Sequence, residues 1–506
     1  MYRSKQQRVL ARTLFVLLFS ALSANAGAQN EDAAIATHFR AGQEAASNQQ
    51  FDRAIAEFTT VLKLDPTLVQ ARANLGLMYY SKHEYNEAVT EFRKVVRAAP
   101  DLLPGELFLG LSYVNVGKPD EAIPALRRAL QLDPNNEEAR RALLLSYLER
   151  DQYDQATEQL SILQKQPAAE EPLYTIAQGY LELGRRLTSG MAKQYRSSAW
   201  AHRLAGDLAG DRGDWLAAAD SYRHALIIDP EISGVHAALA KALRAAGKEN
   251  EAVAEDAVPK QPASVPVNCD ADQLLSCERR LRAKPTAEIF YRLIRANTAL
   301  GNTYFAKLQS SFPDSARAHE LRAEIYRLRQ DFPSALTEFQ LALVKLPEDS
   351  ELHQNVGEML LLLGRVDDAE TELRRAIALS PTNAETEYLL AQVSLKRDNL
   401  EAAISHLKTA LQHDPNLIEV HALLGTAYMH VDKPALAIPE LNYARAIDYH
   451  GDLAFQLFKA YRALGNSAAA DEALRRSKEL RKKSNDFAVS QISGEDALAD
   501  QQVASH

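Results

Sequence analysis

Residues 69–102, VQARANLGLMYYSKHEYNEAVTEFRKVVRAAPDL, contain the pattern that decides the fold. Large apolar side chains recur there at the three- or four-residue spacing of a buried helix face, in two groups: Leu75 and Tyr79, then Phe92 and Val95. Gly76 and Ala88 are small, so two packed helices can approach closely at these residues. Pro100 cannot continue a helix and therefore ends the second one. The stretch predicts one pair of amphipathic helices.

This pattern repeats along the chain with a period of 34 residues. The small contact residue recurs as alanine in two series: Ala54, Ala88, Ala122 and Ala156, then Ala335, Ala369, Ala403 and Ala437. The terminating proline recurs with the same step, at Pro66, Pro100 and Pro134, then at Pro347, Pro381 and Pro415. Several of these prolines follow an aspartate, as in Leu64-Asp65-Pro66. A fixed period of this length indicates a repeat architecture in which each period supplies one helix pair.

The composition agrees with a helical repeat array. The chain has 506 residues, which is more than one hydrophobic core usually serves. Hydrophobic residues make up 46% and charged residues 25%, a balance typical of folded soluble protein. Alanine, leucine, glutamate and arginine are abundant, and these residues favour helix. We therefore expect an all-α fold.

The repeat resembles the tetratricopeptide repeat (TPR), whose signature is W-x2-L-G-x2-Y, then A-x3-F, then P. Residues 103–136 supply Leu109-Gly110, Tyr113, Ala122 and Pro134, and residues 35–68 supply Gly42, Ala54, Phe58 and Pro66. The resemblance covers about four fifths of the chain. It implies an α-solenoid, a right-handed superhelix of antiparallel helix pairs with about eleven full or partial repeats, and a role in protein–protein interaction.

The period divides the chain into two expected arrays. The first, residues 30–256, has repeats near 35–68, 69–102, 103–136, 137–170, a shortened 171–198, 199–232 and 233–256. The second, residues 273–482, has repeats near 273–315, 316–349, 350–383, 384–417, 418–450 and 451–482. Residues 257–272 contain three prolines and predict a linker, at which the arrays either join or bend. Residues 483–506 have no period and predict a disordered tail.

The first 28 residues have the composition of a cleavable signal peptide. Basic residues (Arg3, Lys5, Arg8 and Arg12) precede a short apolar run from Thr13 to Leu22, and small residues follow it. That run is about half the roughly 20 residues needed to span a bilayer, which argues against an uncleaved anchor. We expect a periplasmic or secreted protein.

The charge balance bears on the partners. Cleavage would remove four basic residues and no acidic residue, so 58 basic residues become 54 against 67 acidic ones, a net charge of −13. This balance argues against nucleic acid and anionic lipid as partners. No second apolar stretch is long enough to cross a membrane, so we expect no membrane insertion after cleavage.

Catalytic and cofactor motifs are absent from the sequence. It contains no Gly-rich phosphate loop, no H-E-x-x-H, no G-x-S-x-G and no cysteine cluster with metal spacing. We therefore expect no enzyme activity and no cofactor, and a scaffold that binds a protein or peptide. The alternatives are an accessory subunit of an envelope enzyme or of a secretion or polysaccharide-export machine, and a solenoid that binds metal or a small molecule.

Histidines and cysteines are the residues with the clearest potential chemistry. Six histidines occupy the fourth position of their repeat: His38, His202, His236, His319, His353 and His421. We interpret them as packing residues, because neighbouring repeats would separate them by roughly 10 Å, too far to share a metal ion. Cys269 and Cys277 are the two cysteines. In an oxidising compartment they can form a disulfide, and the alternative is two free thiols.

The resemblance also suggests where a partner binds. In TPR arrays, positions 2, 5, 9 and 12 of each first helix line the concave face. In the first array this mapping gives a largely apolar groove, in which we expect a peptide or helix to bind: Phe39, Leu77, Tyr80, Leu107, Leu111, Val114, Arg141, Leu145 and Leu148. In later repeats the same positions are more polar and acidic, and include Glu385, Tyr388, Gln392, Leu395, Glu419, Ala422, Thr426 and Met429. The alternative is that the apolar residues belong to the core.

Overall fold

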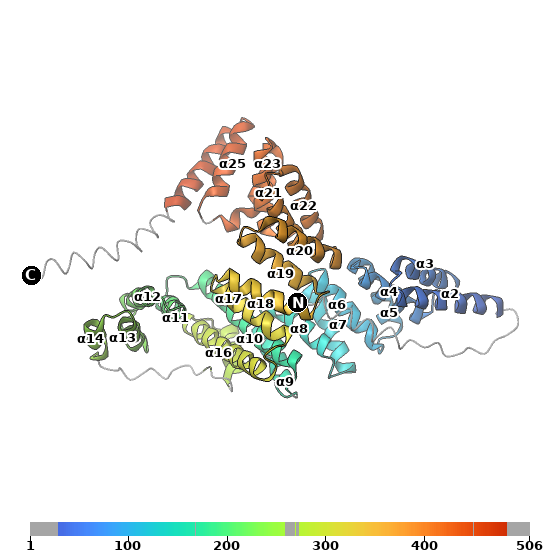
Figure 1. Ribbon diagram of the computed structural model, residues 1–506, viewed down its shortest axis with the longest axis horizontal. Coiled ribbons are helices and arrows are strands. Elements are labelled where there is room, and N and C mark those ends of the chain that lie inside the picture. The colour runs from blue at the N-terminus through green and yellow to red at the C-terminus, as the bar shows by residue number, and fades with distance from the viewer. Residues whose placement is uncertain (1–28, 167, 259–268, 270–272, 449, 483–506) are drawn as a thin grey trace, which may run out of the picture. The chain divides into compact units, whose positions relative to one another are not determined.

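The computed structural model describes residues 29–166, 168–258, 269, 273–448 and 450–482. The predicted signal peptide, the predicted tail and most of the predicted linker lie outside the described residues. Within these residues every regular element is a helix (Figure 1), which confirms the all-α prediction. None of the described helices combines the length and the apolar character that crossing a bilayer requires.

The chain forms two compact units that divide between Asp331 and Phe332. The first unit begins with four helix pairs: α2 (Gln29–Ser47) with α3 (Phe51–Leu64), α4 (Val69–Ser81) with α5 (Tyr85–Ala98), α6 (Leu103–Asn115) with α7 (Pro119–Leu132), and α8 (Glu137–Glu149) with α9 (Tyr153–Leu163). It continues with α10 (Glu170–Gln194), α11 (Ala199–Asp211), α12 (Trp215–Ile228), α13 (Val235–Ala245), α14 (Glu249–Asp256), α15 (Leu274–Ala283), α16 (Ala287–Ser311) and α17 (Ala316–Leu328).

The second unit consists of regular helix pairs and their flanking helices. Its elements are α18 (Phe332–Lys345), α19 (Ser350–Leu362), α20 (Val366–Leu379), α21 (Ala384–Lys396), α22 (Leu400–His413), α23 (Ile418–His430), α24 (Pro434–Tyr443), the short 3₁₀ helix η2 (Ala444–Ile447), α25 (Asp452–Ala463) and a last helix over 467–482. Helices α19 and α20, α21 and α22, and α23 and α24 pack as pairs.

The Asp-Pro dipeptides form the boundaries between repeats. Asp65 lies just after α3 in an extended conformation, which the following proline favours. Its Oδ1 accepts a hydrogen bond from the Thr67 N–H at 2.8 Å, so the aspartate also organises the turn. The same side-chain-to-backbone bond recurs two residues after each related aspartate, at Asp133, Asp229 and Asp414. Each dipeptide therefore ends one helix pair and sets the turn into the next.

Small residues at the helix contacts hold each pair together. Ala54, Ala88, Ala122 and Ala156 are all fully buried, as the period predicts. A Cβ atom built on Gly206 of α11 would lie 2.5 Å from Cε1 of Tyr222 on α12. The Tyr222 ring is buried, and its hydroxyl donates a hydrogen bond to Asp207 at 2.7 Å. The ring is therefore fixed, and the helices can approach this closely only because residue 206 has no side chain.

The fourth residue of a repeat forms a recurrent polar bridge. His353 of α19 contacts Glu372 of α20 through Nδ1 at 2.6 Å, and its Nε2 lies 3.1 Å from the carbonyl oxygen of Pro347, which ends the preceding repeat. Arg72 makes the equivalent pair of contacts with Glu91 and Pro66 in the first unit, both at 2.8 Å. The bridge joins the two helices of a repeat to each other and to the proline before them.

The expected boundary between two arrays at residues 257–272 differs from the structure. The predicted short pairs near 171–198 and 273–315 are replaced by two single helices of 25 residues, α10 and α16, which pack along each other. A Cβ atom on Gly301 of α16 would lie 2.7 Å from Leu181 of α10, which shows how closely they pack. Each irregular segment lacks a local partner because its partner is the other one.

Helices α15 and α17 also belong to the first unit. Helix α15 packs on α9, and α17 is joined to α10 by a buried network. The Tyr174 hydroxyl donates to Glu320, Arg317 donates to Glu320 at 2.5 Å, and the Arg317 guanidinium lies 5.0 Å from the centre of the Tyr174 ring. The unit boundary consequently falls inside the predicted repeat at 316–349, whose second helix is α18.

Two glycines of α11 provide a matched test of the close approach between paired helices. Gly206→Ala should destabilise the chain by about 1–3 kcal/mol, because the new methyl group meets a fixed ring. Gly210→Ala should be neutral or stabilising by up to about 1 kcal/mol, because its Cβ atom would lie 3.3 Å from the partly exposed Trp215, which can shift. Urea denaturation followed by circular dichroism measures both. Equal midpoints for the two variants would contradict the packing argument.

Candidate functional site

The nine residues predicted to line an apolar groove in the first unit are mostly covered. Val114 and Leu145 are half-buried, and the other seven are buried: Phe39, Leu77, Tyr80, Leu107, Leu111, Arg141 and Leu148. Among their neighbours, the Phe39 ring packs edge-on against Phe58, with centroids 5.6 Å apart. The structure thus differs from the expected open groove and places most of these residues in the core, the alternative that the sequence left open. Partner binding at these residues stays a prediction.

The fourth-position histidines are hydrogen-bonding residues as well as packing residues. Four of them each contact one glutamate 19 residues further along the chain, on the second helix of the same repeat: His38, His236, His353 and His421. His202 instead stacks on His224, and burial together with this neighbouring histidine lowers the His202 pKa. Among the described residues no group of three or more His, Cys, Asp or Glu side chains is placed to hold a metal ion. The sequence interpretation missed the glutamate partners.

Cys269 and Cys277 are joined by a disulfide, with their Cα atoms 5.7 Å apart. Cys277 lies on α15, so the bond fixes the chain just before this helix to the helix itself. This arrangement is the one that the spacing of the two cysteines allowed.

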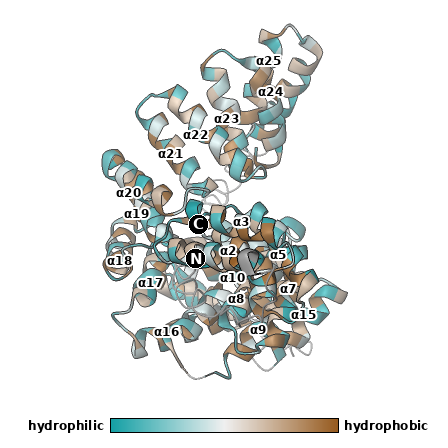
Figure 2. Ribbon diagram, turned by 90° about the vertical axis from the view of Figure 1, so that its right-hand side faces the viewer, coloured by the Kyte–Doolittle hydropathy of each residue, from teal (hydrophilic) through white to brown (hydrophobic). Residues whose placement is uncertain are grey.

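The second unit presents a more accessible candidate surface along α21 and α23. Four residues of each helix share a face because they recur at steps of three and four. They are Glu385, Tyr388, Gln392 and Leu395 on α21, and Glu419, Ala422, Thr426 and Met429 on α23. We call these eight residues the α21/α23 face. Hydrophilic and hydrophobic residues alternate along both helices (Figure 2).

Each helix places the same kinds of group at matching positions of the face. Glu385 and Glu419 are exposed at the helix starts, and neither forms an ion pair with another described residue. Tyr388, Leu395, Ala422 and Met429 are half-buried, so part of each apolar side chain remains accessible. Exposed carboxylates therefore lie beside accessible apolar surface on both helices.

The electrostatics of Tyr388 show that the two helices influence each other. Burial raises the Tyr388 pKa, the Glu419 carboxylate raises it further, and a hydrogen bond with Gln392 opposes the shift. The Tyr388 hydroxyl therefore lies within the field of a carboxylate on the neighbouring helix. This coupling makes the eight residues one continuous surface.

The equivalent positions of α19 are less accessible. Gln354 is buried, and its Oε1 accepts hydrogen bonds from Asn383 and Thr386, both at 2.7 Å. Leu361 is also buried. The candidate surface is therefore restricted to α21 and α23. The sequence mapping had identified these positions, and the structure decides which of them a partner can reach.

Comparisons with known proteins agree with the helix-pair architecture. Two family models described as tetratricopeptide repeat match, one at residues 116–178 and 360–427 and the other at 39–102 and 295–351. A search of curated proteins gives no match.

Similar solved structures include three repeat proteins at low identity. MamA is 22% identical over 32% of this chain and 96% of its own, with a TM-score of 0.30. YrrB, described as a TPR protein with an unusual peptide-binding site, is 18% identical over 35% of this chain and 92% of its own, with a TM-score of 0.30. Yeast Tom70 is 15% identical over 94% of this chain and 98% of its own, with a TM-score of 0.31.

Two leucines of α21 test whether the α21/α23 face is surface or core. Leu390 is buried, so Leu390→Ala should cost about 2–5 kcal/mol of stability. Leu395 belongs to the face and is half-buried, so Leu395→Ala should cost less than about 1 kcal/mol. Chemical denaturation of the full chain compares the two variants. A loss at Leu395 as large as that at Leu390 would show that the face is part of the core.

Proposed function

The chain is a tetratricopeptide repeat protein, and from this premise we propose that it is an exported, non-catalytic scaffold that binds a protein partner on the α21/α23 face. The family supports a role in protein interaction. In arrays of this kind each repeat packs on its neighbours, and the result is an extended surface that suits a partner protein. The partner and the compartment are the finer parts of the proposal, and they rest on the features below.

The observation that carries the proposal is the pairing of Glu385 and Glu419 with accessible apolar side chains. Two carboxylates without ion-pair partners attract a cationic segment and make little difference to folding. The half-buried side chains beside them, such as Leu395 and Met429, provide apolar contact area. A basic, amphipathic peptide or helix complements both features.

The helices that carry the face are already ordered by the repeat packing. Asn383 and Asn399 cap α21 and α22 with side-chain hydrogen bonds to backbone N–H groups. A partner therefore does not have to order this surface, and less binding free energy is lost to conformational entropy. Rigidity of this kind favours recognition of an extended or helical segment.

The binding test places a photoreactive benzoylphenylalanine at position 395 in the full chain and irradiates it in producing cells. We expect an adduct whose cross-linked peptide, identified by mass spectrometry, is basic and amphipathic. Glu385→Lys together with Glu419→Lys should abolish this adduct, because the surface charge is reversed.

The matched control carries the same charge change elsewhere, Glu401→Lys together with Glu472→Lys, both of which are exposed and outside the face. It should leave the adduct unchanged. Absence of any adduct, or equal loss in both double variants, would contradict binding at this face.

Export is tested by the mass of the mature chain. The basic and apolar residues that precede α2 support removal of a signal peptide, so the protein recovered from the envelope or medium should begin near residue 25–29. Intact-mass measurement of that protein determines the first residue. Recovery of a chain that retains Met1, or recovery from the cytoplasm alone, would overturn the proposed location.

A further inference from the structure

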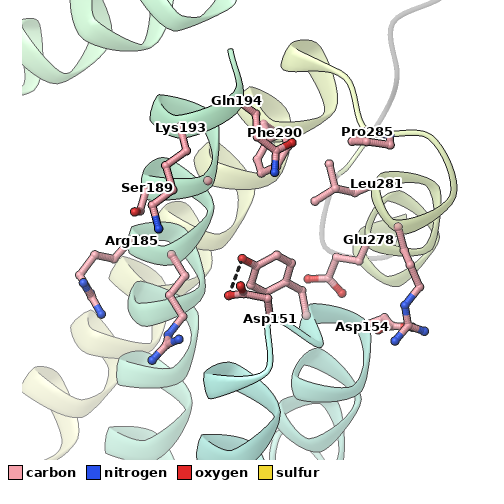
Figure 3. Close-up of a pocket in the computed structure, with 14 residues that line it drawn as sticks. Asp151, Asp154, Arg185, Ser189, Lys193, Gln194, Glu278, Leu281, Pro285 and Phe290 are labelled. Carbon is pink, nitrogen blue, oxygen red and sulfur yellow. Dashed lines mark hydrogen bonds and ion pairs between the residues drawn. The ribbon is translucent and has the colours of Figure 1, made fainter. Parts of the chain in front are cut away.

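A cleft in the first unit has properties that packing between regular repeats does not explain. It has a volume of about 500 Å³ and lies among α9, α10, α15 and α16 (Figure 3). This volume falls in the range of small-molecule sites, roughly 300–1,000 Å³. Helix α10 forms one wall, and α15 forms the opposite wall.

Glu278 of α15 is the most unusual group in the cleft. Its side chain is 2% exposed, and Figure 3 shows its carboxyl group directed into the cleft. Oε1 accepts a hydrogen bond from the Thr157 hydroxyl at 2.6 Å, whereas Oε2 is buried and has no hydrogen-bond partner. An unpartnered buried polar atom costs free energy unless a bound molecule or water satisfies it.

Glu278 carries a proton at neutral pH. Burial raises its pKa to about 8, the hydrogen bond from Thr157 opposes this shift, and the Asp154 carboxylate adds to it. Because Oε1 already accepts the Thr157 hydrogen bond, the proton belongs on Oε2. The group directed into the cleft is therefore a hydrogen-bond donor that lacks an acceptor.

Most of the other charged groups in the cleft are paired. Arg282 donates to Asp154 at 3.1 Å, and Asp151 accepts a hydrogen bond from the Tyr153 hydroxyl at 2.9 Å. Arg185 and Arg186 both donate to Glu182, at 2.6 Å and 2.7 Å.

The ammonium group of Lys193, on α10, makes no ion pair or hydrogen bond with other described residues. The cleft consequently has two uncommitted donors on opposite walls, the Glu278 carboxyl and the Lys193 ammonium. An oxygen-bearing anion would accept a hydrogen bond from one and pair with the charge of the other.

The remaining wall is apolar. Leu281 of α15, Pro285 and Phe290 of α16 line the same cleft (Figure 3). They provide contact area for a hydrocarbon or aromatic body next to the two donors.

We propose that this cleft binds a small organic anion, namely an apolar body with a carboxylate head group, held by hydrogen bonding to Glu278 and by the charge of Lys193. An amine of the same size is disfavoured, since it would place a cation near Lys193, Arg282, Arg185 and Arg186 and would offer no acceptor to the Glu278 proton. This site is independent of the α21/α23 face, because it lies in the other unit.

Titration calorimetry of the full chain with octanoate tests the proposal, and octylamine is the control ligand with the same hydrocarbon tail. We expect one octanoate per chain and no heat of binding from octylamine. Lys193→Met should weaken octanoate binding at least about tenfold, because a charge-assisted interaction is lost. Lys307→Met, which removes a lysine that lies over Tyr304 outside the cleft, should leave the affinity unchanged.

The pH dependence distinguishes the Glu278 proton from a general effect of charge. In the wild-type chain octanoate affinity should fall as pH rises from about 6.5 to about 9, because Glu278 loses its proton near pH 8 and then repels the ligand. In Glu278→Gln the amide keeps a donor and has no charge, so the affinity should stay constant over that range. Octanoate itself remains ionised throughout.

Three outcomes would overturn the proposal. They are no octanoate binding, tighter binding of octylamine, and affinity that neither Lys193→Met nor Glu278→Gln alters in its size or pH profile. Circular dichroism of each variant confirms that the fold is kept. Glu278→Gln is nearly isosteric and removes a buried ionisable group, so it should fold at least as well as the wild type at neutral pH.

Discussion

The close approach of the two helices in each repeat is the constraint on which the other features depend. Residues such as Ala88 and Gly206 are small because a partner side chain, Tyr222 in the second case, occupies the space that a larger residue would need. With that contact fixed, the remaining positions of each helix have assigned directions. The α21/α23 face exists because the opposite sides of α21 and α23 are consumed by packing on their own second helices.

The polar bridge at the fourth position adds a connection between successive repeats. In His353 both ring nitrogens are used, one by Glu372 and the other by the carbonyl oxygen of Pro347. The proline that ends a helix also leaves its own carbonyl available, and the next repeat uses that acceptor. Arg72 replaces the histidine without loss of the contacts, which explains why the position tolerates two residue types. The bridge is therefore a structural element of the repeat.

The sequence predicted those parts of the structure that depend on neighbours. Helix pairs, their small contact residues and the positions of the α21/α23 face all follow from a period of 34 residues. The pairing of α10 with α16 did not follow, because the two helices are separated by the four helices α11 to α14 and each one seems incomplete on its own. Burial of Leu111 was also missed, since position 9 of a repeat does not reveal what covers it. Glu278 gave no signal, because its partner Thr157 is 121 residues away.

The location of the cleft follows from the same reasoning. Regular repeats stack side by side with matched surfaces, so their contacts fill with side chains and a hollow needs a break in the stacking. In the first unit that break is the excursion α11 to α14, after which α15 and α16 return to pack on α9 and α10. Helix α15 has no partner of its own within a repeat, so it meets α9 through polar groups such as Thr157, Asp154 and Arg282. A buried carboxyl group with an unused proton is a natural product of such an imperfect contact, and a ligand that supplies the missing acceptor would stabilise it.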